Sequence, residues 1–151
     1  MKNEKILKEL TDELLSLMMT HATTDVSFDK ENDCYTVNIN GGDETGLLIG
    51  KKGETLLSIQ TILGVLLKQK VGEWLRVTVN VGDYLEKEEE YLKSLALGAA
   101  TRAKETKEPQ NLYNLKANQR RIIHMILADD PEIVAESEGE GEERYLVVKS
   151  K

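Results

Sequence analysis

The sequence predicts an α+β fold in which two small α/β units, residues 1–82 and 83–151, are joined by a long helix. Three observations support this fold class. Apolar residues recur at helical spacing in several segments, β-forming residues cluster in short segments between them, and polar or glycine-containing turns separate neighbouring β segments. The 151 residues are enough for one sizeable core or for two small ones.

The first unit has the predicted order α-β-β-α-α-β. Its elements are helix 4–20, strands 25–28 and 34–39, short helix 45–49, helix 54–70 and strand 74–81. Polar residues 29–33 give the hairpin turn between the first two strands. The first helix is expected to bury Ile6, Leu7, Leu10, Leu14, Leu17 and Met18, and the last strand is expected to begin at Trp74.

The second unit begins with the long helix. Its predicted elements are helix 83–106, short strand 111–115, helix 118–127 and strands 132–136 and 145–149. The apolar face of the long helix is expected to comprise Leu85, Tyr91, Leu92, Leu95, Ala96, Ala99 and Ala103. Residues 139–141 form the turn of a final hairpin, and Pro109 and Pro131 end the two helices that precede them.

Charge is unevenly distributed along the chain. The net charge is −7, yet residues 48–76 carry five basic and two acidic residues, and residues 101–127 carry six basic and two acidic residues. Residues 129–143 carry eight acids and no base. Because salt screens exposed charges beyond roughly 8–10 Å, the two basic stretches can act locally.

Other classes of protein fit less well. No apolar run is long enough to cross a bilayer, so membrane insertion is not expected. The single cysteine, Cys34, cannot form an internal disulfide or a site of cysteines alone, which favours a cytoplasmic protein. No pattern indicates catalysis, a metal, a cofactor or a small-molecule substrate.

Gly50-Lys51-Lys52-Gly53 lies between the two central helices of the first unit. Glycines permit a tight turn and a close approach of the backbone, and the amides of Gly53, Glu54 and Thr55 lie at a helix N-terminus that favours phosphate. Taken alone, such a tetrapeptide is most often a solvated turn. A nucleotide-triphosphatase loop fits poorly, because the spacing from Gly46 is one residue short and Lys52 replaces the magnesium-binding Ser or Thr.

The stretch 46–56 resembles the KH domain of the bacterial Jag (KhpB) family, and the predicted order matches the type II KH topology. The resemblance implies a loop that clamps about four nucleotides of a single strand, with bases in an adjacent apolar groove. It places RNA contacts at Ile49, Gly50, Lys51, Lys52, Gly53, Glu54 and Thr55, with Lys51 and Lys52 holding the phosphates. Ile49, Leu56 and Ile39 are candidates for lining the base groove.

Arg120 and His124 lie four residues apart on the predicted helix 118–127, so their side chains project from one face. Such a pair is usually plain surface. Here the stretches 118–124, 137–141 and 144–148 resemble the single-strand-binding domain named for its Arg-x-x-x-His motif, which follows the KH domain in Jag-like proteins. The resemblance implies a second contact by Arg120 and His124 with Arg121 and Lys116, while residues 122, 123 and 125–127 form the buried side.

Two features depart from the family. Asn118 and Gln119 occupy the places of an aromatic and an acid, and one helix precedes the KH region instead of the usual N-terminal Jag domain. The sequence therefore predicts a non-enzymatic binder of single-stranded RNA, with single-stranded DNA as an open alternative. The expected role is that of a post-transcriptional regulator, an RNA chaperone, or a regulator of cell division, cell shape or the envelope, with another small KH protein as a candidate partner. A protein-interaction adaptor on a KH scaffold is the competing hypothesis.

Overall fold

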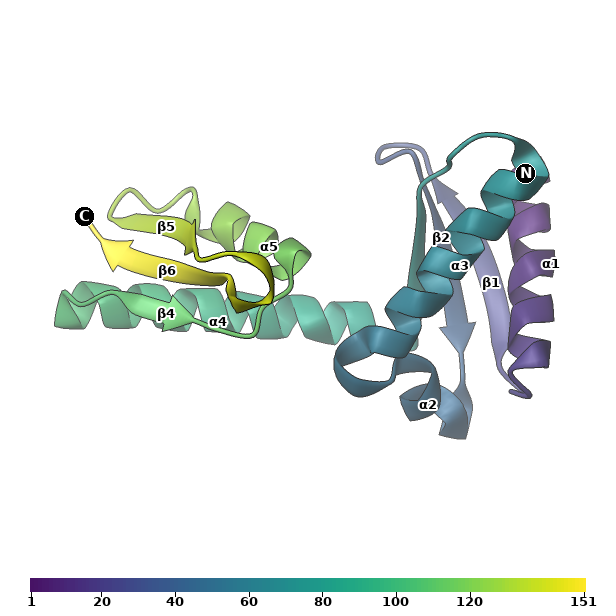
Figure 1. Cartoon of the computed structure of the whole chain (residues 1–151), viewed down its shortest axis with the longest axis horizontal. Helices are drawn as coiled ribbons and strands as arrows, with labels where there is room; N and C mark the ends of the chain where they lie inside the picture. The colour runs from purple at the N-terminus through teal and green to yellow at the C-terminus, as the bar shows by residue number, and fades with distance from the viewer. The chain divides into compact units, whose positions relative to one another are not determined.

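A computed structural model of residues 1–151 contains two three-stranded sheets, each covered by helices (Figure 1). The chain divides into two units, Met1–Leu85 and Glu86–Lys151, which are described separately. None of the helices combines the length and apolar character that crossing a bilayer requires.

The first unit has the predicted order of elements. These are α1 (Lys2–Leu17), β1 (Thr23–Asp29), β2 (Cys34–Asn40), α2 (Thr45–Ile49), α3 (Glu54–Val71) and β3 (Val77–Val81). The sheet order is β1-β2-β3, in which β1 and β2 are antiparallel and β2 and β3 are parallel. This α-β-β-α-α-β order is the topology that the sequence predicted.

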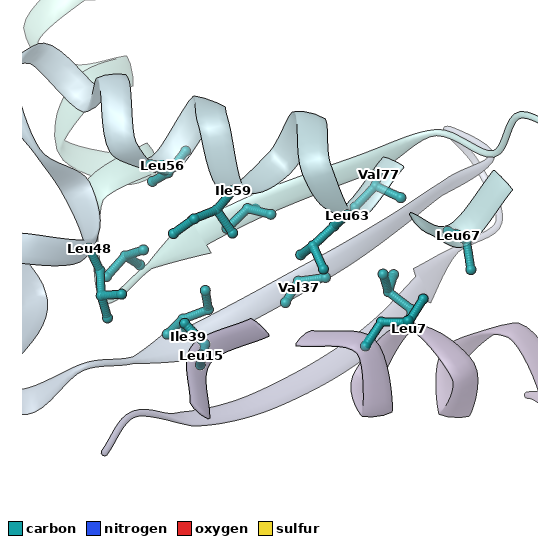
Figure 2. Packing of buried hydrophobic residues seen from close by; sticks show 13 residues of the cluster. Leu7, Leu15, Val37, Ile39, Leu48, Leu56, Ile59, Leu63, Leu67 and Val77 are labelled. Atoms are coloured by element: carbon teal, nitrogen blue, oxygen red, sulfur yellow. The ribbon is translucent and has the colours of Figure 1, made fainter. Parts of the chain in front are cut away.

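The core of the first unit lies between one face of this sheet and helices α1 and α3 (Figure 2). Register places Val37 beside Val79 and Ile39 beside Val81, so their side chains share one face of the sheet. Leu7 on α1 and Leu63 on α3 are fully buried against that face. Burial of this apolar surface is the main stabilising contribution to the unit.

Two expectations for the first unit are wrong. Leu17 is 77% exposed because the buried stripe of α1 is centred on Leu7, Thr11 and Leu15, and Leu17 lies about 200° around the helix from Leu15. Trp74 lies outside the sheet and is 67% exposed. The reason is that α3 ends on Gly72 with φ of 95°, which turns the chain into a loop before β3 begins.

The second unit contains most of α4 (Tyr84–Thr106), followed by β4 (Gln110–Leu112), α5 (Ala117–Leu127), β5 (Ile133–Glu138) and β6 (Tyr145–Ser150). Its sheet is antiparallel, with β6 between β4 and β5. Leu146 and Val148 point from β6 into a core that α4 lines chiefly with alanines. These short side chains let the helix lie close to the sheet.

The long helix and α5 each carry one apolar residue that was wrongly expected to be buried. Tyr91 is 60% exposed because it lies at the edge of the stripe through Leu92 and Ala96. Met125 is 62% exposed because it lies about 200° around α5 from both Ile123 and Leu127, which are buried. The predicted strand 111–115 is also shorter, ending at Leu112.

Candidate nucleic-acid interface

The loop between α2 and α3 has an unusual backbone. Gly50, Lys52 and Gly53 have φ values of 71°, 54° and 73°, so most of this short loop uses the positive-φ region that glycine favours. Gly50 has ψ of −175°, a combination open essentially only to glycine. Lys52 occupies the left-handed helical region. The tight reversal predicted from the paired glycines is therefore present.

Glycine is required at both ends of this loop by the protein itself. A Cβ on Gly50 would lie 2.8 Å from the Cβ and 3.0 Å from the backbone nitrogen of Thr55. A Cβ on Gly53 would lie 3.0 Å from Cζ of Tyr84, whose hydroxyl would be closer still. The loop thus folds tightly against the start of α3, and its shape leaves Lys51 and Lys52 exposed to solvent.

The backbone amides contribute less than the sequence suggested. The Gly53 N–H donates to the carbonyl of Gly50 at 3.4 Å, and the Glu54 N–H donates to the carbonyl of Lys51. Two of the three amides expected to face a phosphate are therefore already used within the loop. An anion at this loop would be attracted instead by the two lysines and by the positive end of the α3 dipole.

The expected base groove needs a correction. Ile39 and Leu56 are each only 2% exposed and belong to the core of the first unit, so they cannot line an accessible groove. Ile49 is half-buried and packs at the edge of that core. Thr55 is half-buried, and Glu54 is exposed at the first position of α3.

The beginning of α5 is fixed by Gln119. Its Oε1 accepts a hydrogen bond from the Lys116 N–H at 2.8 Å, which satisfies an amide at the start of the helix. Its Nε2 donates to Oε1 of Glu88 on α4, also at 2.8 Å. The side-chain amide of Gln119 therefore caps α5 with its oxygen and contacts α4 with its nitrogen, which a carboxylate, having no donor, could not do.

Arg120 has a structural role as well as a surface position. Its Nη1 donates to the carbonyl of Leu115 at 2.6 Å and to the carbonyl of Arg144 at 3.3 Å. These contacts tie the loop before α5 to the start of β6. The guanidinium is therefore held in a defined place rather than moving freely on the helix surface.

A cavity of about 500 Å³ opens beside this guanidinium, with a lining that is dominated by basic side chains. Its residues are Ala117, Arg120, Arg121, His124, Met125, Ser137 and Arg144. Arg120, Arg121 and His124 are thus brought together as predicted, whereas Lys116 is not part of the lining. His124 also borders a second hollow of about 380 Å³ along β5.

Arg144 and Ser137 were missed by the sequence reasoning. Glu138 pairs with Tyr145 in the antiparallel hairpin, and this pairing brings their neighbours Ser137 and Arg144 to the same end of the hairpin, next to α5. No local sequence pattern indicated this, because Ser137 and Arg144 come together only when β5 pairs with β6. A guanidinium can form two parallel hydrogen bonds to a phosphate, so three arginines around one cavity favour a phosphate-bearing ligand.

The acids of β5 lie close to this site but are paired. Lys149 Nζ lies 3.2 Å from Glu136 and 3.5 Å from Glu138, and the hydrogen bond that Lys149 donates to Glu136 raises the pKa of the lysine. The Tyr145 hydroxyl donates to Glu138 at 3.1 Å, and this bond raises the pKa of the tyrosine. Pairing reduces the negative potential that these carboxylates would otherwise project beside the arginines. No group of three or more His, Cys, Asp and Glu side chains is placed to hold a metal ion.

Comparisons with known proteins agree with the two units. Residues 4–81 match the family model described as "KhpA/KhpB, KH domain", and residues 90–150 match the model of the domain named for its Arg-x-x-x-His motif. The chain is 30% identical over 143 residues to a protein named RNA-binding protein KhpB from Clostridium symbiosum, covering 95% of this chain and 64% of the relative. It is 36% identical over 112 residues to the protein of that name from Bacillus subtilis, covering 73% of this chain and 54% of the relative. The corresponding protein from Lactiplantibacillus plantarum is 31% identical over 147 residues, covering 97% of this chain and 45% of its own length.

Proposed function

The chain belongs to the KhpB (Jag) family, and from this premise we propose that it binds single-stranded RNA through the phosphate backbone. The observation that carries the proposal is the Gly50–Gly53 loop, whose left-handed backbone presents Lys51 and Lys52 to solvent at the start of α3. The chain spans between 45% and 64% of the length of the three relatives described above, so the activity of the whole protein is part of the proposal.

The loop would act as a clamp for phosphates. Lys51 and Lys52 supply two point charges, and the N-terminus of α3 adds the partial positive charge of the helix dipole. A loop of this kind holds about four nucleotides in KH domains. Reading of bases would fall to neighbouring side chains other than Ile39 and Leu56, which are buried.

The arginine-lined cavity would provide a second phosphate contact. Arg120, Arg121 and Arg144 can each form a bidentate fork to a phosphate, and His124 can stack on a base or donate a hydrogen bond. Two linked weak contacts on one strand raise the affinity through effective concentration. Lys116, at the beginning of α5, would add positive charge without lining the cavity.

The cellular role that we propose rests on membership of the family. A non-enzymatic RNA-binding protein of the cytoplasm would act as a post-transcriptional regulator or RNA chaperone, with effects on cell division, cell shape or the envelope. The three relatives are named RNA-binding proteins, and the matching KH model covers KhpA as well as KhpB. A second small KH protein is therefore the partner we propose.

The test is the double substitution Lys51→Asp with Lys52→Asp. Asp tolerates the left-handed backbone at Lys52, so the fold should persist, as circular dichroism would verify. Affinity for a single-stranded RNA should fall by at least about tenfold. The slope of log K against log salt should become shallower by about 1.4, since each phosphate contact on a single strand contributes about 0.7.

A matched control separates the site from overall charge. Lys2→Asp with Lys5→Asp changes the net charge equally at exposed positions of α1. If the loop variant and this control have the same affinity and salt slope, the loop does not hold phosphates. Competition between RNA and DNA oligomers of the same sequence would then identify the preferred sugar, since preference for RNA requires contacts to the 2′-hydroxyl.

The alternative is a protein-interaction adaptor. It is favoured by the net charge of −7 and by the eight acids between residues 129 and 143, which would repel a polyanion. Under this alternative, RNA affinity is weak at physiological salt, and a partner protein stays bound to the chain after nuclease treatment.

A further inference from the structure

The loop between α3 and β3 carries the only tryptophan of the chain on its surface. Trp74 is 67% exposed, although tryptophan usually buries most of its large apolar ring. It lies just after Gly72, whose left-handed conformation ends α3 and directs the chain away from the core. Trp74 is not part of the core of the first unit, so its indole is accessible to a ligand.

One basic side chain lies over this tryptophan, and two more are close to it in sequence. Lys68 Nζ lies 5.2 Å from the centroid of the ring, within the range of a cation–π contact. Lys70 and Arg76 are exposed on either side of Trp74 in the sequence, and Glu73 is the one acid between them. We call Lys68, Lys70, Trp74 and Arg76 the Trp74 patch.

We propose that the Trp74 patch is a second contact for single-stranded RNA on the first unit, in which the indole stacks on a base and the cations hold the adjacent phosphates. This inference rests on the proposed function. An exposed aromatic ring among cations is the arrangement by which single strands are bound without sequence preference. Charge complementarity favours RNA as the ligand, because the patch has an excess of positive charge and RNA is a polyanion.

The patch lies at the opposite end of α3 from the Gly50–Gly53 loop (Figure 1). The 18 residues of α3 span about 27 Å, so an oligonucleotide of about four nucleotides that fills the loop cannot also reach Trp74. Between the two sites, the exposed positions of α3 include Ser58, Thr61, Ile62, Val65 and Gln69, none of which is charged. A longer strand can therefore run along the helix without repulsion.

Trp74 itself reports the test, because its fluorescence can be excited separately from that of the tyrosines and is quenched when a base stacks on the indole. The full chain is titrated with a single-stranded RNA of about four nucleotides and with one of about 16, the upper end of the usual site size. The long RNA should quench Trp74, and the short RNA should leave it unchanged. The fluorescence anisotropy of labelled RNA gives both affinities.

Substitution separates stacking from charge. Trp74→Ala should weaken binding of the long RNA by about 5- to 150-fold, the range for loss of one stacked base, and should leave the short RNA unaffected. Trp74→Phe should recover part of the loss, because phenylalanine still offers a ring. Leu17→Ala, which truncates a residue that is 77% exposed on α1, is the matched control and should change neither affinity.

The outcomes distinguish this inference from the proposed function. If the short RNA binds through Lys51 and Lys52 but the long RNA neither quenches Trp74 nor loses affinity in Trp74→Ala, the patch is not an RNA contact and the loop assignment stands. If neither RNA binds, both proposals fail. A blue shift of Trp74 emission on anionic lipid vesicles, without quenching by RNA, would overturn the inference by assigning the patch to a membrane surface.

Discussion

Replacing Gly50 with alanine should distort the Gly50–Gly53 loop, and the structure allows the cost in stability to be divided into two parts. The backbone at φ 71° and ψ −175° is nearly closed to alanine, which costs about 1–3 kcal/mol. The new Cβ would also lie 3.0 Å from the backbone nitrogen of Thr55, which cannot move without shifting α3. Overpacking of this kind costs about 1–3 kcal/mol. The expected loss of stability in the first unit is therefore about 2–6 kcal/mol.

Two other glycines of the same unit separate these contributions. Gly42 has φ of 52°, but a Cβ added there would have no atom within 4 Å, so Gly42→Ala should cost only the backbone strain, about 1–2 kcal/mol. Gly64 lies inside α3 with open space around its Cβ position, so Gly64→Ala should stabilise the unit by about 1 kcal/mol. The three substitutions add the same methyl group and differ only in backbone conformation and neighbours.

Amide hydrogen exchange measured by NMR is the suitable assay, because it reports each unit separately. Protection of the Val37 amide in the central strand reports the first unit, and protection of Val147 reports the second. Gly50→Ala should lower protection at Val37, leave Val147 unchanged and weaken RNA binding. If Gly50→Ala costs no more than Gly42→Ala, the contact with Thr55 does not constrain the loop and the reasoning is wrong.

Two further predictions concern the second unit. Arg120→Ala removes two hydrogen bonds from a charged donor to backbone carbonyls and should destabilise the unit by about 1.5–3 kcal/mol. Arg121→Ala, at an exposed position, should change the stability by no more than about 0.5 kcal/mol. Both variants should weaken RNA binding, so the difference in their stability, measured by denaturant unfolding, separates the structural role of Arg120 from a role in contact alone. The hydrogen bond from Lys104 lowers the pKa of Asp130 from its usual 3.8, so its stabilising contribution is present above that value and is lost as the pH falls through the lower folded pKa. Unfolding measured between about pH 5 and pH 2 should therefore show a weaker pH dependence in Asp130→Asn, and an unchanged acid limb would contradict the assignment.

The order and type of the elements could be predicted because apolar spacing and turn residues carry that information locally. Val37, Ile39, Val79 and Val81 alternate with polar residues, and this period of two indicates a strand with one buried face. The errors at Leu17, Tyr91 and Met125 have one cause. Each is an apolar residue one or two positions in sequence from a buried residue, which places it about 100° (Tyr91) or about 200° (Leu17 and Met125) around the helix from that residue.

The candidate site was only partly predictable, for a different reason. Lys51, Lys52, Arg120 and His124 carry their signal in local spacing. Arg144 joins the cavity only through antiparallel pairing and the hydrogen bond that its carbonyl accepts from Arg120, which no local pattern shows. Burial of Ile39 and Leu56 is likewise a consequence of how the sheet and α3 pack, so an apolar residue near a loop could not be assigned to a groove or to the core beforehand.

The net charge of −7 is a poor guide to where a polyanion can bind this chain. Of the eight acids between residues 129 and 143, four lie within ion-pair distance of a lysine: Asp130 and Glu132 with Lys104, and Glu136 and Glu138 with Lys149. Paired carboxylates project a weaker field than isolated ones, and salt screens what remains beyond roughly 8–10 Å. Long-range attraction or repulsion of RNA by the chain as a whole would therefore be weak, and the affinity would depend on short-range contacts made by exposed cations. On this argument, the position of each lysine and arginine would decide binding, rather than their number.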